Sequence, residues 1–427
     1  MDYGGDMNAV AATAQTRRGF ASIAALYAVT MIGGTLPVPL WHSWSVRLRF
    51  GPMATTTAFA VYAVGTVVAL TLFARTSEQV GRRPVLVAGL TVTAISSGLL
   101  LVASDVAMIM LARLLGGIGA GLVTTTASAA LNELADPAHP RLAAATPTLV
   151  NVGGLGAGIL IAAYSLQIGG ENAATVRWLY AGYLITVVTA GVGVSLIPET
   201  VPDASWAGFH WSIARPTLPP ARADRAMFGW AAASVFVAFA VTGLFSSLVP
   251  GFLREDIRLT SPLSAGLVVA SLFMTALVTQ LVSSERAMQS LWLGCAALSV
   301  GTALYESGLV TDRLEVFIVG TVAAGSGFGL VFGRGLHATQ QVAAPGRRAD
   351  QLATYFLCAY AGNVVPTVGL GTISEITGGR AASVGLAVLI ALGALISGAG
   401  ASREQRAGRD WSRIDTEAAG DEEAWSR

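Results

Sequence analysis

Twelve long stretches without charged residues restrict the fold of this chain more than any other feature of its sequence. Each stretch has at least 18 residues, and only the fourth is interrupted, by Arg113. A helix that crosses the hydrocarbon core of a bilayer needs about 20 mostly apolar residues. The stretches cover residues 19–46, 50–74, 84–104, 106–132, 142–170, 178–198, 226–253, 259–284, 287–305, 316–333, 351–374 and 381–402.

Continuous apolar runs of this length exclude β-barrel strands, which are about half as long and alternate in polarity. Backbone polar groups must pair within a membrane-spanning segment, so each stretch is predicted to be a helix. The composition agrees, because 12% of the residues are charged, whereas soluble domains have about 25%. We therefore predict an all-α membrane protein with twelve transmembrane helices, here called spans.

Composition also restricts the partners and cofactors. The formal net charge of +1 provides no basic face for a nucleic acid. Cys295 and Cys358 both lie in spans, where they are predicted to be small hydrophobic residues and not parts of a disulfide or metal site. We expect no metal and no other cofactor.

A sequence repeat divides the spans into two sets of six. The segment GIGAGLV at Gly117–Val123 returns 208 positions later as GSGFGLV at Gly325–Val331, with five of seven residues identical. At the same offset Gly154 matches Gly362, and each copy of the segment lies in the fourth span of its half. Repeats of this period are typical of duplicated membrane transporters. Two pseudo-symmetric six-helix bundles are therefore predicted.

The bundles are expected at residues 18–198 and 226–402, joined by a proline-rich linker at 199–225. Residues 1–17 and 403–427 have few large apolar side chains, so disordered ends are predicted. The linker is expected to be irregular, and the alternative is a short helix on the membrane surface. That helix would present the apolar residues Trp206, Phe209, Trp211 and Ile213.

Arginine distribution predicts the orientation. If the amino terminus is cytoplasmic, the inside segments carry eighteen arginines and the outside segments carry seven. An excess of basic residues marks cytoplasmic loops. We predict a multi-pass protein of the plasma (inner) membrane with both chain ends in the cytoplasm.

The loop after the second span carries a specific motif, ARTSEQVGRRP. It resembles the signature Gly-x-x-x-Asp-Arg-x-Gly-Arg-Arg of the major facilitator superfamily, although Gln79 replaces the first arginine of that signature. The resemblance implies that Glu78 and Arg82 lock the two halves together through the start of span 11 and release during transport. The alternative is that the arginines only anchor the loop in the cytoplasm. The predicted gating motif comprises Ala74, Glu78, Gly81, Arg82 and Arg83.

Arg113 and Glu133 are the candidate coupling residues, and both lie in span 4. An arginine within a span costs a few kcal/mol or more, so it normally faces the bundle interior. Its position resembles that of the helix 4 arginine in the superfamily, which implies a role with protons or anionic substrate groups. The alternatives are an Arg113 that extends to the lipid headgroups and a Glu133 that is a solvated carboxylate at a helix end. No acid is expected at membrane depth.

Span 5 reads NVGGLGAGILIAA from Asn151 and resembles the glycine-rich signature of antiporters through Gly153, Gly154 and Gly158. Ile159 stands where that signature has proline. Close packing between the halves is the alternative meaning of these span 5 glycines. For Gly117 and Gly121, as for Gly325 and Gly329, a packing role is the prediction, because small residues four apart let helix backbones approach. The glycines expected at helix contacts are Gly117, Gly121, Gly154, Gly158, Gly325 and Gly329.

Polar and aromatic side chains within the spans are candidates for the wall of a central cavity. For each of them, ordinary packing between helices is the alternative. The candidates are Tyr27, Thr30, Asn151, Trp230, Phe239, Phe245, Gln280, Tyr360 and Asn363. Pro37, Pro39 and Pro366 are expected to bend spans 1 and 11, as broken helices do around transport sites.

These observations predict a secondary active transporter that works by alternating access and exports small amphipathic compounds in exchange for protons. The alternative is a facilitator or symporter for a sugar or another small metabolite. An enzyme is not expected, because no nucleophile–base pair, metal cluster or phosphate loop is visible. A non-transporting receptor remains only if binding occurs without translocation. The expected partners are a small-molecule substrate, protons and the lipid bilayer, with the chain as a monomer.

Overall fold

The computed structural model describes residues 3–73, 75–135, 140–201, 204–205, 217–247, 249–255, 257–283, 291–342, 348–377 and 379–425. Within these ranges every regular element is a helix. Twelve of the described helical segments are long and apolar enough to cross a membrane. The predicted all-α membrane fold with twelve spans is therefore confirmed.

The amino-terminal half runs from the first to the sixth span. Its first span comprises α1, a short 3-10 helix and α2, because Pro37 and Pro39 lack the N–H groups that would continue one helix. The elements are α1 (Tyr3–Thr35), η1 (Val38–Leu40), α2 (Trp41–Leu48), α3 (Pro52–Leu72), α4 (Thr76–Gln79), α5 (Arg82–Leu101), α6 (Val106–Glu133), α7 (Pro140–Gly169), α8 (Ala173–Gly193) and η2 (Val194–Leu196).

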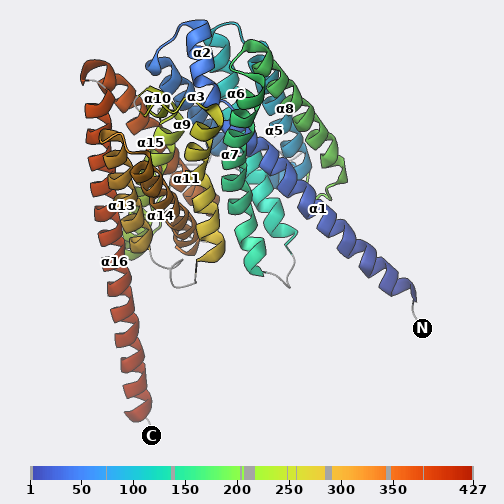
Figure 1. Ribbon diagram of the computed structural model, residues 1–427. Helices are drawn as coiled ribbons and strands as arrows, with labels where there is room; N and C mark the ends of the chain where they lie inside the picture. The colour runs from blue at the N-terminus through green and yellow to red at the C-terminus, as the bar shows by residue number, and fades with distance from the viewer. Residues whose placement is uncertain are drawn as a thin grey trace.

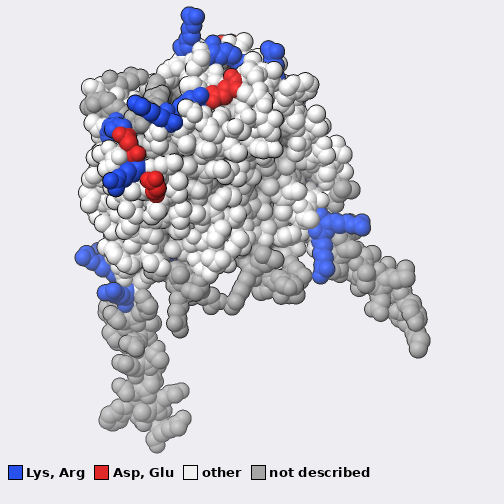
Figure 2. Space-filling model, in the orientation of Figure 1, with Lys and Arg blue, Asp and Glu red and all other residues white. Residues whose placement is uncertain are grey.

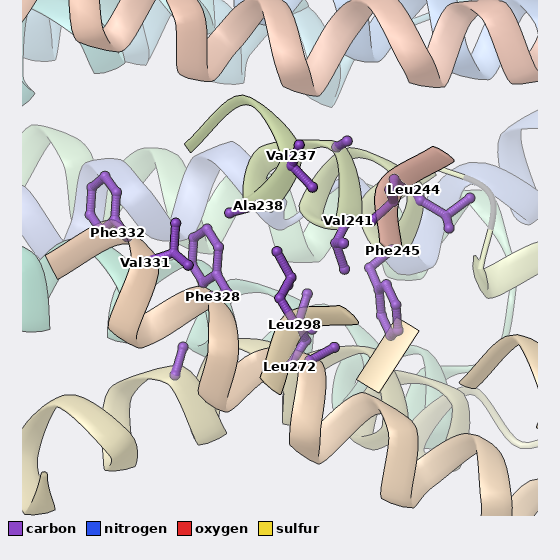
Figure 3. Packing of buried hydrophobic residues seen from close by; sticks show 14 of the residues in the cluster. Val237, Ala238, Val241, Leu244, Phe245, Leu272, Leu298, Phe328, Val331 and Phe332 are labelled. Carbon is purple, nitrogen blue, oxygen red and sulfur yellow. The ribbon is translucent and has the colours of Figure 1, made fainter. Parts of the chain in front are cut away.

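The carboxyl-terminal half repeats this order, and its first helix α9 is likewise followed by a short helix, α10. Pro366 lies inside α15, which continues beyond it to Thr377. The elements are α9 (Arg222–Ser247), α10 (Val249–Glu255), α11 (Pro262–Val282), α13 (Leu291–Val310), α14 (Leu314–Gln341), α15 (Arg348–Thr377) and α16 (Gly379–Trp425). Each half has its own apolar core, and Figure 3 shows the one around Phe245 and Phe328.

Local capping explains where several spans begin. The Asp105 side chain accepts a hydrogen bond from the backbone N–H of Met108, at 2.8 Å, and thereby starts α6. Asn172 caps α8 in the same way, and prolines occupy the first turns of α3 and α11. The capping side chains accept hydrogen bonds from free N–H groups at the helix start, and proline has no N–H group there to pair. Short polar segments are therefore sufficient to separate the spans.

The structure describes helix at both ends of the chain. α1 already begins at Tyr3 and α16 continues to Trp425, so both helices extend beyond the bundle on the same side (Figure 1). Ala, Arg and Glu are strong helix formers, and a span supplies the nucleus that an isolated helix lacks. The linker aromatics Trp206, Phe209, Trp211 and Ile213 lie outside the described residues.

We call the side from which α1 and α16 project the terminus face, and the opposite side, which carries α2 and α10, the α2 face (Figure 1). In the view of Figure 2 most charged side chains gather near these two faces, and the broad middle of the surface is uncharged. That distribution is expected for a molecule whose middle lies in hydrocarbon.

The repeated glycines occupy equivalent places in the two halves. A Cβ atom on Gly117 would lie 1.9 Å from the backbone oxygen of Tyr62 in α3. One on Gly325 would lie 2.4 Å from the backbone oxygen of Leu272 in α11. The duplicated segment therefore performs the same packing twice, with α6 against α3 and α14 against α11.

The remaining predicted packing glycines also lie at helix contacts. Gly121 and Gly329 face the backbones of α3 and α11, one turn beyond the first pair. Gly154 and Gly158 bring α7 against the backbone of α1. Between the halves, α7 packs on α11 and α3 packs on α15. These two crossings frame the space that contains the candidate site.

Candidate functional site

A cavity of about 330 Å³ lies between the two halves. It extends from Tyr27 and Asn151 within the spans to Glu78 and Arg82 at the terminus face. The Asn151 side-chain amide donates a hydrogen bond of 2.8 Å to the Tyr27 hydroxyl. Two of the predicted cavity residues, from α1 and α7, therefore meet at its wall.

The amino-terminal half supplies the polar wall of this cavity. Hydroxyl and amide side chains project from one side of α6, because their spacing places them on one helical stripe. They join the pair of Tyr27 and Asn151 and the neighbouring Thr148 of α7. The polar residues that α6 contributes are Thr124, Thr125, Ser128 and Asn132.

The carboxyl-terminal half supplies an apolar wall. Phe332 and Leu336 come from α14, and Leu352, Ala353 and Phe356 come from α15. Phe332 and Phe356 are in ring contact, with centroids 6.4 Å apart. The cavity therefore has a hydrogen-bonding side and an aromatic side, and each comes from a different half.

Phe239 and Tyr360 lie behind the aromatic wall. The Phe239 ring contacts Phe328, Phe332 and Tyr360, with centroid distances of 5.6, 5.7 and 5.9 Å. Phe332 thus belongs both to this cluster and to the cavity lining. Phe239 and Tyr360 support the wall without forming its surface.

Five other predicted cavity residues make contacts elsewhere. Thr30 donates to the Leu26 carbonyl oxygen within α1, and Gln280 donates to the Gly329 carbonyl oxygen. The remaining three contact neighbouring helices of their own half: Asn363 donates to Thr242, Trp230 packs on Gly400, and Phe245 packs on Tyr305 and Phe317. None of the five is among the residues that line the cavity. The apolar pattern of a span does not show which side of the helix faces inward.

The motif loop is tied to its own half, contrary to the predicted latch. Arg82 and Glu133 of α6 form a forked ion pair, with distances of 2.6 Å for Nη2–Oε1 and 3.3 Å for Nε–Oε2. The Arg82 guanidinium also donates to Ser77, at 2.6 Å. Glu78 is exposed and forms no ion pair with any described residue, and Ala74 lies outside the described residues.

Glu199, which follows the sixth span, completes this arrangement. Its carboxylate accepts hydrogen bonds from the backbone N–H groups of Arg82 and Arg83, at 2.8 and 3.1 Å. An acid at a helix start is favourable because free N–H groups and the helix dipole meet there. Gly81 has φ +99°, and a Cβ atom on it would lie 2.7 Å from the Glu199 carboxylate. The motif glycine is therefore required by backbone geometry.

Different residues form the contact with the start of span 11. Arg75 Nη2 lies 2.8 Å from Oδ2 of Asp350, which is in the first turn of α15. Sequence reasoning missed this pair because Arg75 lies outside the conserved positions of the family signature. The one feature of the sequence that indicated this pair is that Arg75 and Asp350 each lie directly at the end of a span.

A second ion pair joins the halves at the α2 face. Arg254 of α10 and Glu171, which follows α7, are 2.7 Å apart. Beside them the Ser261 hydroxyl donates to the Gln167 side chain at 2.9 Å. These groups border a hollow of about 290 Å³ that also includes His42 and Trp41. Within the described part of the chain, each face of the bundle therefore has one ion pair between the halves.

Arg113 is enclosed within the amino-terminal half and neither lines the cavity nor extends to headgroups. It is 2% exposed, and its Nη1 atom donates to the carbonyl oxygen of Gly34 at 3.1 Å. Gly34 lies in the last turn of α1, where carbonyl groups lose their helical partners. The guanidinium also lies 4.1 Å from the centroid of the Tyr62 ring, a favourable cation–π contact. The carboxyl-terminal end of α1 and the Tyr62 ring therefore bind the Arg113 guanidinium.

Glu306 is buried near the end of its span. It is 6% exposed, although only four residues of α13 follow it. Among the described residues, no group of three His, Cys, Asp or Glu side chains is placed to hold a metal ion.

The chain matches the family described as the Major Facilitator Superfamily over residues 19–367. No curated protein matches its sequence with statistical significance.

Several solved structures are similar in fold. A POT family transporter in complex with 5-aminolevulinic acid superposes with a TM-score of 0.71 at 12% identity, covering 91% of this chain and 96% of that one. A variant of the nucleoside transporter NupG gives 0.69 at 12% identity, covering 88% and 99%. The human organic anion transporter MFSD10 (TETRAN) gives 0.59 at 14% identity, covering 90% and 99%.

Proposed function

The chain belongs to the Major Facilitator Superfamily, and from this premise we propose that it exports small amphipathic compounds in exchange for protons. It is a multi-pass membrane protein and a transporter. The observation that carries the finer proposal is the two-sided cavity between the halves.

The wall chemistry supports an amphipathic substrate. Asn151 and the hydroxyl groups of α6 offer hydrogen bonds, while Phe332 and Phe356 offer aromatic faces. Arg82, the cation in the lining, is neutralised by Glu133. The exposed acid Glu78 lies at the cavity mouth. A neutral or singly cationic molecule with one polar and one apolar side fits this combination.

The two ion pairs between the halves support alternating access. Arg75–Asp350 holds the terminus face, and Arg254–Glu171 holds the α2 face. Substrate can leave the cavity on one side only if the pair on that side separates. Transport therefore requires the two pairs to break in turn as the halves rock about the α7–α11 and α3–α15 crossings.

Glu133 is our candidate for the exchanged proton. Its side chain is 35% exposed and therefore reachable by water. It accepts hydrogen bonds from Arg82 and from the Thr200 hydroxyl. Protonation removes its charge and weakens the fork with Arg82, which frees the motif loop. We place the terminus face in the cytoplasm, as the arginine distribution predicts.

Reconstitution in liposomes tests the proposal. Purified protein is incorporated, an amphipathic cationic dye is placed on the terminus-face side, and a pH gradient is imposed with the α2-face side acidic. We expect dye to accumulate on the acidic side, and we expect accumulation to stop when an uncoupler collapses the gradient.

Two outcomes would contradict parts of this proposal. Dye movement that is the same with and without the uncoupler would remove the antiport and leave a facilitator. Absence of dye movement, together with uptake of a sugar or another metabolite, would favour the alternative substrate class. A Glu133→Gln variant should lose accumulation, whereas the matched Glu315→Gln variant, at an exposed acid far from the cavity, should keep it.

A further inference from the structure

A buried carboxyl group lies between two helices that do not line the cavity. Glu306 of α13 is 6% exposed, and its Oε1 atom lies 2.8 Å from the hydroxyl of Ser383 on α16. Its Oε2 atom is buried and has no hydrogen-bond partner among the described residues. The transport mechanism proposed above does not use this group.

Among the residues that the structure describes, no charged group pairs with Glu306. Arg380, one turn before Ser383 on α16, pairs with Asp312 at 2.5 Å. Arg313 and Glu315, next to the start of α14, are exposed. On the inner side, Tyr305 of α13 packs against the aromatic rings Phe245 of α9 and Phe317 of α14. The carboxyl group therefore faces a hydroxyl and apolar surroundings.

The hydrogen bonds of Ser383 bear on whether Glu306 carries a proton. The Ser383 Oγ atom is 2.8 Å from Glu306 Oε1 and also 2.9 Å from the carbonyl oxygen of Arg380. A hydroxyl has one hydrogen to donate, and a carbonyl oxygen can only accept. If Ser383 donates to the carbonyl oxygen, the hydrogen between Ser383 and Glu306 has to come from the carboxyl group.

We propose that Glu306 is a proton-binding site, a neutral carboxylic acid that donates to Ser383, which in turn donates to the Arg380 carbonyl oxygen. Among the described residues, an ionised carboxylate here would have one hydrogen bond, one buried oxygen without a partner and no paired cation. Burial of such a charge costs several kcal/mol, and a bound proton removes that cost. Loss of the proton would place a charge between α13 and α16 and weaken their packing.

Carbodiimide labelling and infrared spectroscopy test this proposal on the full-length protein. The carboxyl proton moves to one nitrogen of dicyclohexylcarbodiimide while a carboxyl oxygen adds to its central carbon. The resulting O-acylisourea rearranges to an N-acylurea, so nothing leaves and the protein gains the mass of one reagent molecule. We expect this gain on the peptide that contains Glu306. Glu306→Gln should abolish the gain there, and Glu315→Gln should leave it unchanged.

The infrared difference spectrum between wild type and Glu306→Gln at neutral pH tests whether Glu306 is protonated, even if dicyclohexylcarbodiimide cannot reach it. Loss of a protonated-carboxyl carbonyl band in the variant supports the proposal. Loss of an ionised-carboxylate band instead would overturn it. Ser383→Ala should keep the carbonyl band but shift its frequency, because the hydrogen-bond acceptor is gone. Retained monodisperse elution of each variant shows that it is folded.

Discussion

The two halves share a packing scheme but differ in the ionisable side chains that they bury. Gly117 and Gly325 press their helices against equivalent backbones. Four residues before these glycines, the amino-terminal half has Arg113, whereas the carboxyl-terminal half has Thr321, which donates to the carbonyl oxygen of Phe317. The cation thus has no counterpart in the second half.

The buried acid shows the converse asymmetry. Gly89 of α5 and Gly294 of α13 make equivalent contacts with α6 and α14. Twelve residues after these glycines stand Leu101 and Glu306. Backbone contacts that hold the scaffold together are common to both halves, while the buried ionisable side chains Arg113 and Glu306 each belong to one half. The helix packing that both halves share and the buried ionisable residues that only one half has can therefore be altered by separate substitutions.

The largest expected effect comes from the shared scaffold. Gly117→Ala and Gly325→Ala each place a methyl group within about 2.5 Å of backbone oxygen, so the helices must move apart. Such overpacking costs about 1–3 kcal/mol or more, and we expect both variants to lower the thermal unfolding midpoint in detergent.

Gly98→Ala and Gly385→Ala are the matched controls, because a methyl group at either position meets no atom within 4 Å. Both should unfold at or above the wild-type temperature, since alanine is the better helix former. If only one of the two tight glycines proved sensitive, the packing equivalence of the halves would be refuted.

Arg113→Met tests the charge that only the first half carries. A buried cation without an anion is costly, so its replacement by an apolar chain should leave stability unchanged or raise it. Transport of the dye should fall at least roughly tenfold if the cation acts in the cycle. Thr321→Val, at the equivalent position, should change neither property by a comparable amount.

A marked loss of thermal stability in Arg113→Met, with transport per folded molecule retained, would contradict this prediction. It would show that the hydrogen bond to Gly34 and the contact with Tyr62 are structural supports, and that the asymmetry between the halves has no part in transport.

The smallest effects are expected at the ion pairs between the halves. A double-mutant cycle of Arg75→Gln and Asp350→Asn should give a coupling energy on the order of 1 kcal/mol or less, because the Arg75 side chain is 34% exposed. Arg254→Gln with Glu171→Gln provides the same cycle at the α2 face. Labelling rates of a cysteine introduced at Asn151, measured from each side, report which face opens.

We expect loss of the Arg75–Asp350 pair to increase access from the terminus face and loss of the Arg254–Glu171 pair to increase access from the α2 face. Equal changes from both sides in either variant would show that the pair stabilises the fold without controlling one face.

The twelve spans, the two halves and the packing role of Gly117 and Gly325 follow from the sequence alone. They depend on local composition and on a linear repeat, and the bilayer demands long apolar helices whatever their neighbours. The tertiary structure decided which polar groups meet. Asn151 reached the cavity while Gln280 and Asn363 did not, and the partner of Arg82 proved to be Glu133.

Those pairings depend on the rotation of each helix about its axis, and a span that is apolar all round leaves that rotation undetermined in the sequence. Glu306 is the clearest case. It resembles a solvated helix-end acid in the sequence, and only the approach of α16, with Ser383 and the Arg380 carbonyl oxygen, encloses it. The bilayer thus requires long apolar helices, whereas contacts between helices far apart in the sequence determine which polar side chains meet.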